Sequence, residues 1–213
     1  MATTFRPDQH GFRFANRFED EFVKLPGGKH AFKTRGRCGG MAFLALDHWH
    51  HKRPIPACET LPANETPLAK LIQKRLFESF ALNGLRYVEF ALMPLHPKLG
   101  LLKGAAKLTR TNEFPKVKAS IDRGEPCAIG LCQADSLKAL GGDHQVVCYG
   151  YVETREESGL LIWDNNHPGK EQRLTFATRY AKDGDMTIRH SDGSKWRAFF
   201  HEKYKPECPP EGL

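Results

Sequence analysis

Gly36-Arg-Cys-Gly-Gly-Met-Ala-Phe-Leu-Ala-Leu-Asp-His-Trp49 is the segment on which the fold depends. It begins with glycines around Cys38 and continues into an apolar run. Its apolar residues recur every three or four positions and so share one side of a helix: Met41, Ala42, Ala45 and Trp49. Pro54 and Pro56 prevent the helix from continuing. The segment therefore predicts a buried helix that carries a cysteine in its first turn.

The sequence on either side of this helix predicts an extended arm and more helices. In residues 11–18, Phe12, Phe14 and Phe18 alternate with polar residues, as in a strand or arm with one buried face. A second apolar repeat at helical spacing runs through residues 68–79, and Thr66-Pro67 is a suitable start. A further helix is expected over residues 112–123, because Gly124 is well placed just beyond its end.

The sequence changes character at Pro126, where short apolar runs separated by glycines and charged turns predict strands. The runs are Cys127–Cys132, Gln145–Val152, Leu160–Trp163, Arg173–Phe176, Met186–Arg189 and Trp196–Phe200. Since helices precede strands, we expect an α+β fold with helices packed on a mainly antiparallel sheet. One domain is expected over residues 1–213, with a helical part at about 36–124 and a sheet part at about 125–204. The tail Pro206–Leu213 is expected to be loose.

Composition limits the class of protein. Of the 213 residues, 40% are hydrophobic and 27% are charged, which suits a folded domain rather than a disordered chain. The net charge is +7, but lysines and arginines are interleaved with acidic residues, so a nucleic-acid partner is not expected. No apolar stretch approaches the roughly 20 residues that span a membrane. The N-terminus lacks an apolar signal core, so we expect a cytoplasmic protein; export or delivery by another route stays open.

The six cysteines do not form a metal-binding pattern, because none are spaced Cys-x-x-Cys. Cys127, Cys132 and Cys148 lie in apolar runs and are expected to be small buried hydrophobic residues. Cys38 differs because it begins a helix. A thiol reacts as its thiolate, which helix N–H groups and a nearby imidazolium both stabilise. The glycines beside Cys38 are expected to leave the backbone open to a substrate, although Cys38 suits a tight junction equally well.

Two later motifs add to the case for a nucleophile. His144 begins an apolar strand after a glycine pair, 106 positions beyond Cys38 (144 − 38). Asp164 follows another apolar strand and can accept a hydrogen bond from an imidazole, fixing its tautomer and orientation. Asn165 and Asn166 are the alternatives for this third position. An ordinary hairpin turn would explain Asp164-Asn-Asn if it stood alone.

The three motifs together resemble a known family. Cys38-Gly-Gly-Met-x-Phe-x-Ala-Leu-Asp47, Asp143-His-Gln-Val-Val-x-Tyr-Gly-Tyr151 and Trp163-Asp-Asn-Asn-His-Pro-Gly169 resemble papain-like cysteine peptidases of the bacterial C39-like kind. The resemblance covers about residues 11–176. It implies a papain-like fold, in which the cysteine helix packs on a sheet bearing the histidine and the acid. It also implies a Cys-His-Asp triad, matching Cys38, His144 and Asp164.

One departure from the family concerns the oxyanion. Papain-like enzymes often carry a glutamine a few residues before the nucleophile, and residues 30–35 contain none. Asn16 is the candidate replacement if the N-terminal arm packs beside the helix, and a turn asparagine is the alternative. Gln145 is expected to face away from His144.

The expected chemistry is hydrolysis of a peptide, isopeptide or amide bond through an acyl-enzyme, without a metal or other cofactor. His48 and His51 would share a helix face, but no clear third metal ligand accompanies them. The lysines and arginines of residues 54–107 favour an acidic peptide or protein substrate. The alternatives are an acyltransferase with the same site, an inactive papain-like module that binds peptides or proteins, and a nucleic-acid-binding protein with a fortuitous trio.

Overall fold

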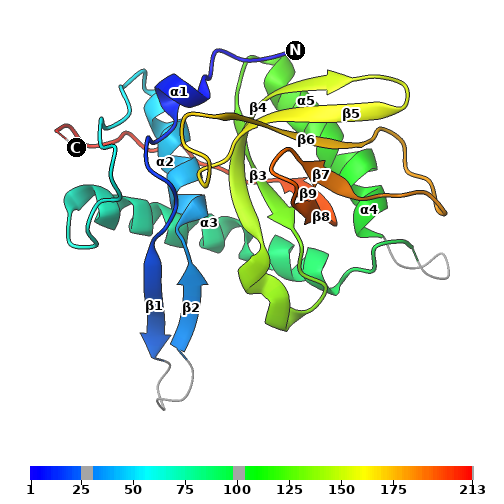
Figure 1. The fold of residues 1–213 in the computed structure, drawn as a ribbon, viewed down its shortest axis with the longest axis horizontal. Coiled ribbons are helices and arrows are strands. Elements are labelled where there is room, and N and C mark those ends of the chain that lie inside the picture. Colours follow the sequence, from blue (N-terminus) through cyan, green and yellow to red (C-terminus); the bar gives the residue numbers. More distant parts are fainter. Residues whose placement is uncertain (25–30, 98–103, 213) are drawn as a thin grey trace.

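An antiparallel sheet forms the centre of the computed structural model, which describes residues 1–24, 31–97 and 104–212 (Figure 1). Within this part of the chain the sheet has seven strands in the order β8-β7-β6-β5-β4-β3-β9. The strands are β3 (Cys127–Cys132), β4 (His144–Glu153), β5 (Glu157–Trp163), β6 (Glu171–Ala177), β7 (Ile188–His190), β8 (Lys195–Trp196) and β9 (Ala198–His201). Every neighbouring pair is antiparallel. The expected α+β class with a mainly antiparallel sheet is therefore confirmed.

The helices precede the sheet in the chain, as predicted. They are α1 (Pro7–His10), α2 (Cys38–His50), α3 (Pro67–Leu92), α4 (Ala105–Leu108) and α5 (Phe114–Asp122). A π-helical turn, η1 (Thr109–Glu113), joins α4 to α5, and a 3-10 turn, η2 (Leu137–Gly142), precedes β4. The helix expected at residue 112 thus begins as α5 two residues later, after η1. Gly124 follows α5 with φ +81°, a left-handed conformation that suits glycine.

Both faces of the central strands are buried. On β4, Val147 and Tyr149 join a core cluster with α2 and the N-terminal arm. Val146 and Cys148 join a second cluster with α5. Because successive side chains of a strand point to opposite faces, α2 and α5 pack on opposite sides of the sheet. Central strands of this kind read as continuous apolar runs, which is why the sequence shows them so clearly.

The N-terminal part differs from its prediction in two ways. Residues 11–18 form no strand, although Phe12, Phe14 and Phe18 are buried as expected. Strands β1 (Glu19–Lys24) and β2 (Ala31–Arg35) form an antiparallel pair that projects from the rest of the molecule (Figure 1). This pair lies in the chain between Asn16 and Cys38, so it separates two residues of the candidate site in sequence.

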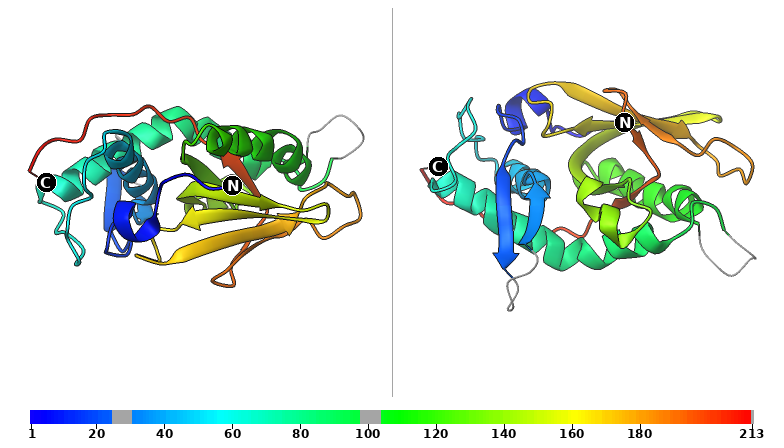
Figure 2. Two further views of the ribbon diagram at one scale, coloured as in Figure 1. Left: turned by 90° about the horizontal axis from the view of Figure 1, so that it is seen from above. Right: turned by 60° about the horizontal axis from the view of Figure 1, so that its bottom comes forward.

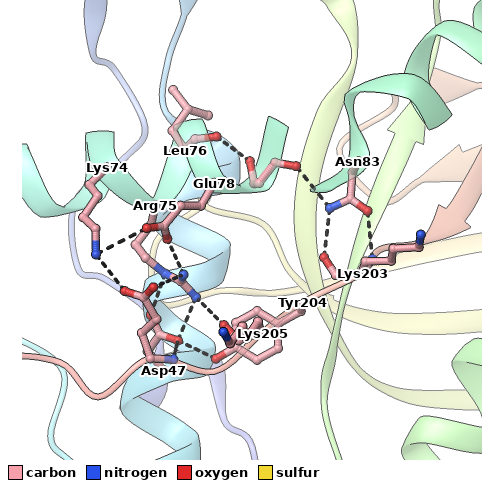
Figure 3. A network of polar contacts seen from close by, with 11 residues as sticks. Asp47, Lys74, Arg75, Leu76, Glu78, Asn83, Lys203, Tyr204 and Lys205 are labelled. Carbon is pink, nitrogen blue, oxygen red and sulfur yellow. Dashed lines mark hydrogen bonds and ion pairs between the residues drawn. The ribbon is translucent and has the colours of Figure 1, made fainter. Parts of the chain in front are cut away.

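The C-terminal segment from Lys203 onward packs on α2 and α3, and it includes Glu207 of the tail Pro206–Leu213 that was expected to be loose. Figure 2 follows it along α3 and past α2. Asn83 of α3 accepts from the backbone N–H of Lys203 at 2.8 Å and donates to its carbonyl at 2.9 Å. Asp47 of α2 accepts from the Tyr204 hydroxyl at 2.6 Å and from the Glu207 backbone at 2.9 Å (Figure 3). Buried side chains of two helices therefore anchor a tail whose own composition is polar.

None of the described helices has the length and apolar character needed to cross a membrane.

Candidate active site

Cys38 is the first residue of α2 and is half-buried. The first backbone bond of the helix joins Met41 N–H to the Arg37 carbonyl at 3.0 Å. The N–H groups of the first turn before Met41 therefore have no acceptor within the helix. The thiol is thus placed where helix N–H groups and the positive end of the helix dipole favour a negative charge.

His144, the first residue of β4, lies between Cys38 and Asp164. Its Nε2 is 2.8 Å from Asp164 Oδ1, and its ring lies near enough to the Cys38 side chain for that side chain to raise the pKa of the imidazole. Because the carboxylate occupies Nε2, Nδ1 is the nitrogen left for the sulfur. The structure thus brings together the three residues that the sequence proposed as a triad.

The electrostatics of this trio favour an imidazolium. Burial disfavours the charged ring, but the Asp164 carboxylate and the Cys38 side chain outweigh it and raise the pKa of His144 to about 10. Burial also opposes the charge of Asp164, yet the contact with His144 keeps the pKa of Asp164 well below its usual value. A ring that stays protonated can hold a thiolate beside it and later give its proton to a leaving group.

Asp164 has a second histidine beside it, which the sequence gave no reason to select. His190 of β7 places Nε2 at 3.1 Å from Asp164 Oδ2. The backbone N–H of Asn166 donates to Asp164 Oδ1 at 2.8 Å. His190 lies 26 positions after Asp164 (190 − 164) on a three-residue strand, and no local pattern connects the two. Pairing of β7 with β6 brings them together.

Asn16 packs against the start of α2, as the sequence required for an oxyanion role. Its Oδ1 accepts from the backbone N–H of Arg37 at 2.6 Å, and its own backbone N–H donates to the Asn165 carbonyl at 2.9 Å. Gly36 has φ +92°, and a Cβ there would lie 2.4 Å from Asn16 Nδ2. The Asn16 side chain is therefore fixed against Arg37, the residue before Cys38. Its Oδ1 accepts the Arg37 N–H, and its Nδ2 lies beside Gly36.

Asn165 and Asn166, the alternatives for the third position, do other things. Asn165 is fully buried and donates from Nδ2 to the carbonyls of Cys38 at 3.2 Å and Gln145 at 3.0 Å. It therefore fastens the start of α2 to the start of β4, and it does not orient the imidazole. Asn166 Nδ2 lies 3.4 Å from His144 Nε2, but Asp164 holds that nitrogen at a shorter distance.

The glycines after Cys38 have a different purpose from the expected one. A Cβ at Gly39 would lie 1.7 Å from Gln145 Oε1, and a Cβ at Gly40 would lie 1.9 Å from the Ile72 carbonyl oxygen of α3. Both glycines are buried. They permit close packing of α2 against β4 and α3 and do not open the backbone to a substrate. Gln145 packs beneath the helix, away from the imidazole, with Nε2 2.6 Å from buried Glu202.

Two neighbours of the trio complete its surroundings. Arg37 is buried, donates to the Ala69 carbonyl at 2.7 Å, and lies 4.3 Å over the ring of Phe18. These contacts tie Arg37, the residue before Cys38, to α3 and to the N-terminal arm. The indole of Trp196 in β8 stacks on the His144 ring at 6.2 Å between centroids and helps to shield the imidazole from water.

Two groups of side chains contain potential metal ligands. Asp164, His167 and Asp192 bring ligand atoms within 4.8 Å of one another, the described group that comes nearest to a metal site. However, both Asp164 oxygens already face imidazole nitrogens, so a cation would have to displace a histidine. His48 is buried, and His51 contacts the Asp47 carbonyl at 3.0 Å. Among the described residues, no group of three potential ligand residues includes either of them.

Comparisons of the chain with models of protein families, with curated proteins and with solved structures give no match.

Proposed function

We propose that this protein is a cysteine hydrolase, a thiol peptidase or amidase with a papain-like arrangement. The observation that carries the proposal is the position of His144, 2.8 Å from Asp164 and near enough to the Cys38 side chain for that side chain to raise the pKa of the imidazole. Nucleophile, base and orienting acid in this order are the requirement for covalent acyl transfer. Support also comes from the architecture, since a buried helix carries the cysteine and adjacent strands carry the histidine and the acid.

The proposed reaction has two stages. The Cys38 thiolate attacks the carbonyl carbon of the substrate, a C–S bond forms, and His144 transfers its proton to the departing amine as the C–N bond breaks. His144 then removes a proton from water, which attacks the acyl carbon and releases the acid and the thiolate. The N–H of Cys38 and the Nδ2 group of Asn16 stabilise the oxyanion in both stages, each donor worth about 3 kcal/mol.

A peptide or protein substrate fits this chemistry, but an acidic one is not specifically favoured. The described basic residues of the 54–107 stretch include many that already have carboxylate partners. Lys70 lies 3.3 Å from Glu65, and Lys74 lies 2.9 Å from Glu207. Arg75 and Arg86 are paired likewise. Such pairs neutralise the charge that would attract an acidic chain, so the proposal rests on the trio and carries no requirement for substrate charge.

Alkylation with iodoacetamide near pH 7 tests the nucleophile directly. Cys38 is expected to react at least tenfold faster than Cys58 and Cys208, because a thiolate held by an imidazolium reacts where an ordinary thiol is mostly protonated. These two cysteines are the internal controls, since Cys58 is half-buried like Cys38 and Cys208 is exposed. Modification is followed at each site by mass spectrometry of peptides. His144→Ala is expected to remove the advantage of Cys38.

The outcomes separate the alternatives. If Cys38 reacts no faster than Cys58 in the folded protein, the nucleophile proposal fails and a binding module with an inert trio remains. If Cys38 is reactive, a peptide ester traps the acyl-enzyme as a mass increase on Cys38. Decay of that adduct in water marks a hydrolase, whereas decay only after an amine is added marks an acyltransferase.

A further inference from the structure

A chain of alternating histidines and aspartates continues beyond Asp164. His190 Nε2 is 3.1 Å from Asp164 Oδ2, and His190 Nδ1 is 3.0 Å from Asp192 Oδ1. Asp192 Oδ2 in turn is 3.2 Å from His167 Nε2. The groups thus run from the buried trio to the surface, where His167 is partly exposed. They come from the segment after β5, from the last residue of β7 and from the turn between β7 and β8.

His190 is the buried member of this extension. Its side chain is 0% exposed, and the Asp164 side chain is only 3% exposed. The backbone N–H of Asp192 donates to His190 Nδ1 at 3.0 Å. A neutral ring that accepts at Nδ1 carries its proton on Nε2. A protonated ring also carries one there, so in either charge state the hydrogen-bearing Nε2 lies 3.1 Å from Asp164 Oδ2, in a close polar contact whose geometry is not that of a regular hydrogen bond.

We propose that His190 is a positioning residue for the reaction of Cys38, holding Asp164 so that its other oxygen faces His144. The inference rests on the proposed function and adds a fourth side chain to it. Without His190, Asp164 Oδ2 loses its contact with an imidazole while it stays buried. Leaving a buried acceptor unpaired is costly. The carboxylate would then turn or take up a proton, and either change weakens its hold on His144.

The contacts of His190 explain why this position suits a histidine. A planar ring with two nitrogens spans the gap between Asp192 on the surface and Asp164 below it. His190 N–H also donates to the Ser194 carbonyl at 3.0 Å, which fixes the turn that carries Asp192. The charged and titratable groups that face the ring are therefore Asp164, Asp192 and His167, whose ring centroid is 6.0 Å from that of His190. His144 is the outer partner of Asp164.

Two substitutions of nearly equal polarity separate the proposed role from packing. The amide of glutamine reaches the place of Nε2 in a histidine, whereas the amide of asparagine reaches only the place of Nδ1. His190→Gln keeps a donor for Asp164. In this variant iodoacetamide is expected to alkylate Cys38 at a rate within about threefold of the wild-type rate. His190→Asn loses that donor and is expected to slow alkylation about tenfold. His201→Asn, at a histidine remote from the trio on β9, is the control and leaves the rate unchanged.

The pH dependence gives a readout that a packing defect would not move. His190 is one of the contacts that keep the pKa of Asp164 low. In His190→Asn, Asp164 stabilises the His144 imidazolium less, so the thiolate beside that ring forms at a higher pH and the acid side of the alkylation profile shifts upward. In His190→Gln the acid side of the profile is expected to stay near that of the wild type. Each variant is first checked for cooperative unfolding, and the two amide variants are compared at equal folded fractions.

The failures of the two proposals are distinguishable. If wild-type Cys38 reacts no faster than Cys58 and Cys208, the proposed function itself is overturned. If wild-type Cys38 is fast and depends on His144, while His190→Asn keeps the wild-type rate and acid profile, only the role of His190 is overturned. A rate that falls on adding a chelator to the wild type also overturns it, because Asp164, His167 and Asp192 would then be acting as metal ligands.

Discussion

Asn16 shows at the scale of single residues how a tertiary contact can replace a sequence motif. The expected glutamine is missing from its place before Cys38, and in the proposed site a side chain 22 positions earlier (38 − 16), which is hydrogen-bonded to Arg37, takes its role. The β1–β2 pair stands between them in the chain. The sequence could single out Cys38, His144 and Asp164 because each stands at a position with its own local pattern. Cys38 begins a helix, His144 begins a strand, and Asp164 follows the end of a strand.

The residues that hold these three were less accessible from the sequence. Asn165 was considered for the triad, but its value comes from contacts with two backbone carbonyls. His190 reaches Asp164 only because β5, β6 and β7 are neighbours in the sheet. Such contacts depend on strand order and register, which a single sequence does not specify.

Asn16→Ala separates binding of the oxyanion from activation of the thiol. Loss of an oxyanion donor is expected to lower the rate of acyl-enzyme formation by about 10²–10³. Alkylation by iodoacetamide forms no oxyanion, so its rate at Cys38 is expected to stay close to that of the wild type. Stopped-flow acylation by a peptide ester and alkylation followed by mass spectrometry measure the two rates on the same preparation. Equal losses in both would show that Asn16 acts on the thiol or on folding instead.

At the scale of elements, α2 can pack closely on its neighbours because two of its residues, Gly39 and Gly40, have no side chain. Gly39 and Gly40 allow the helix to lie close to β4 and α3. A tertiary contact also determines where one of the predicted strands is interrupted. The predicted strand Trp196–Phe200 is broken at Arg197, whose backbone N–H donates to the Cys132 carbonyl at 2.9 Å. Apolar pattern alone finds such elements, but it does not find an interruption that depends on a partner strand.

Gly40→Ala is expected to destabilise the protein by about 1–3 kcal/mol, because the new methyl group overlaps a backbone oxygen that cannot turn aside. The matched control is Gly84→Ala in α3, where a Cβ meets nothing within 4 Å. That change is expected to stabilise the protein by about 1 kcal/mol, through helix propensity alone. Denaturant unfolding measures both. If the two substitutions have the same sign, the close approach of α2 to α3 is not what requires Gly40.

At the scale of the whole molecule, one buried ion pair joins three parts of the chain. Asp47 of α2 meets Arg75 of α3 through Nε at 2.8 Å and Nη2 at 2.9 Å. The same arginine donates to the Lys205 carbonyl at 3.0 Å, and Asp47 accepts from Tyr204 (Figure 3). The sequence predicted both helices but not the segment across them, because Tyr204 and Glu207 are held by tertiary contacts with α2 and α3, this ion pair among them.

Arg75→Met and Lys74→Met test whether the buried pair holds this arrangement. Arg75→Met leaves the Asp47 carboxylate buried without its cation, so unfolding is expected to become easier by about 3–5 kcal/mol. Lys74 is the adjacent residue on α3 and also contacts Glu207 and Glu78, but its side chain is 57% exposed. Its loss is expected to cost at most about 1 kcal/mol, because water and salt screen an exposed pair.

Limited proteolysis of the same two variants tests the connection to the tail. The segment after Glu202 is expected to be cut much faster in Arg75→Met than in Lys74→Met, since only Arg75 supports the carboxylate that receives Tyr204 and Glu207. Cleavage at equal rates would mean that Asn83 and its contacts with Lys203 hold the tail without the ion pair. In that case the order of the tail would depend on α3 alone, and α2, with Cys38, would keep its place through the close packing at Gly39 and Gly40.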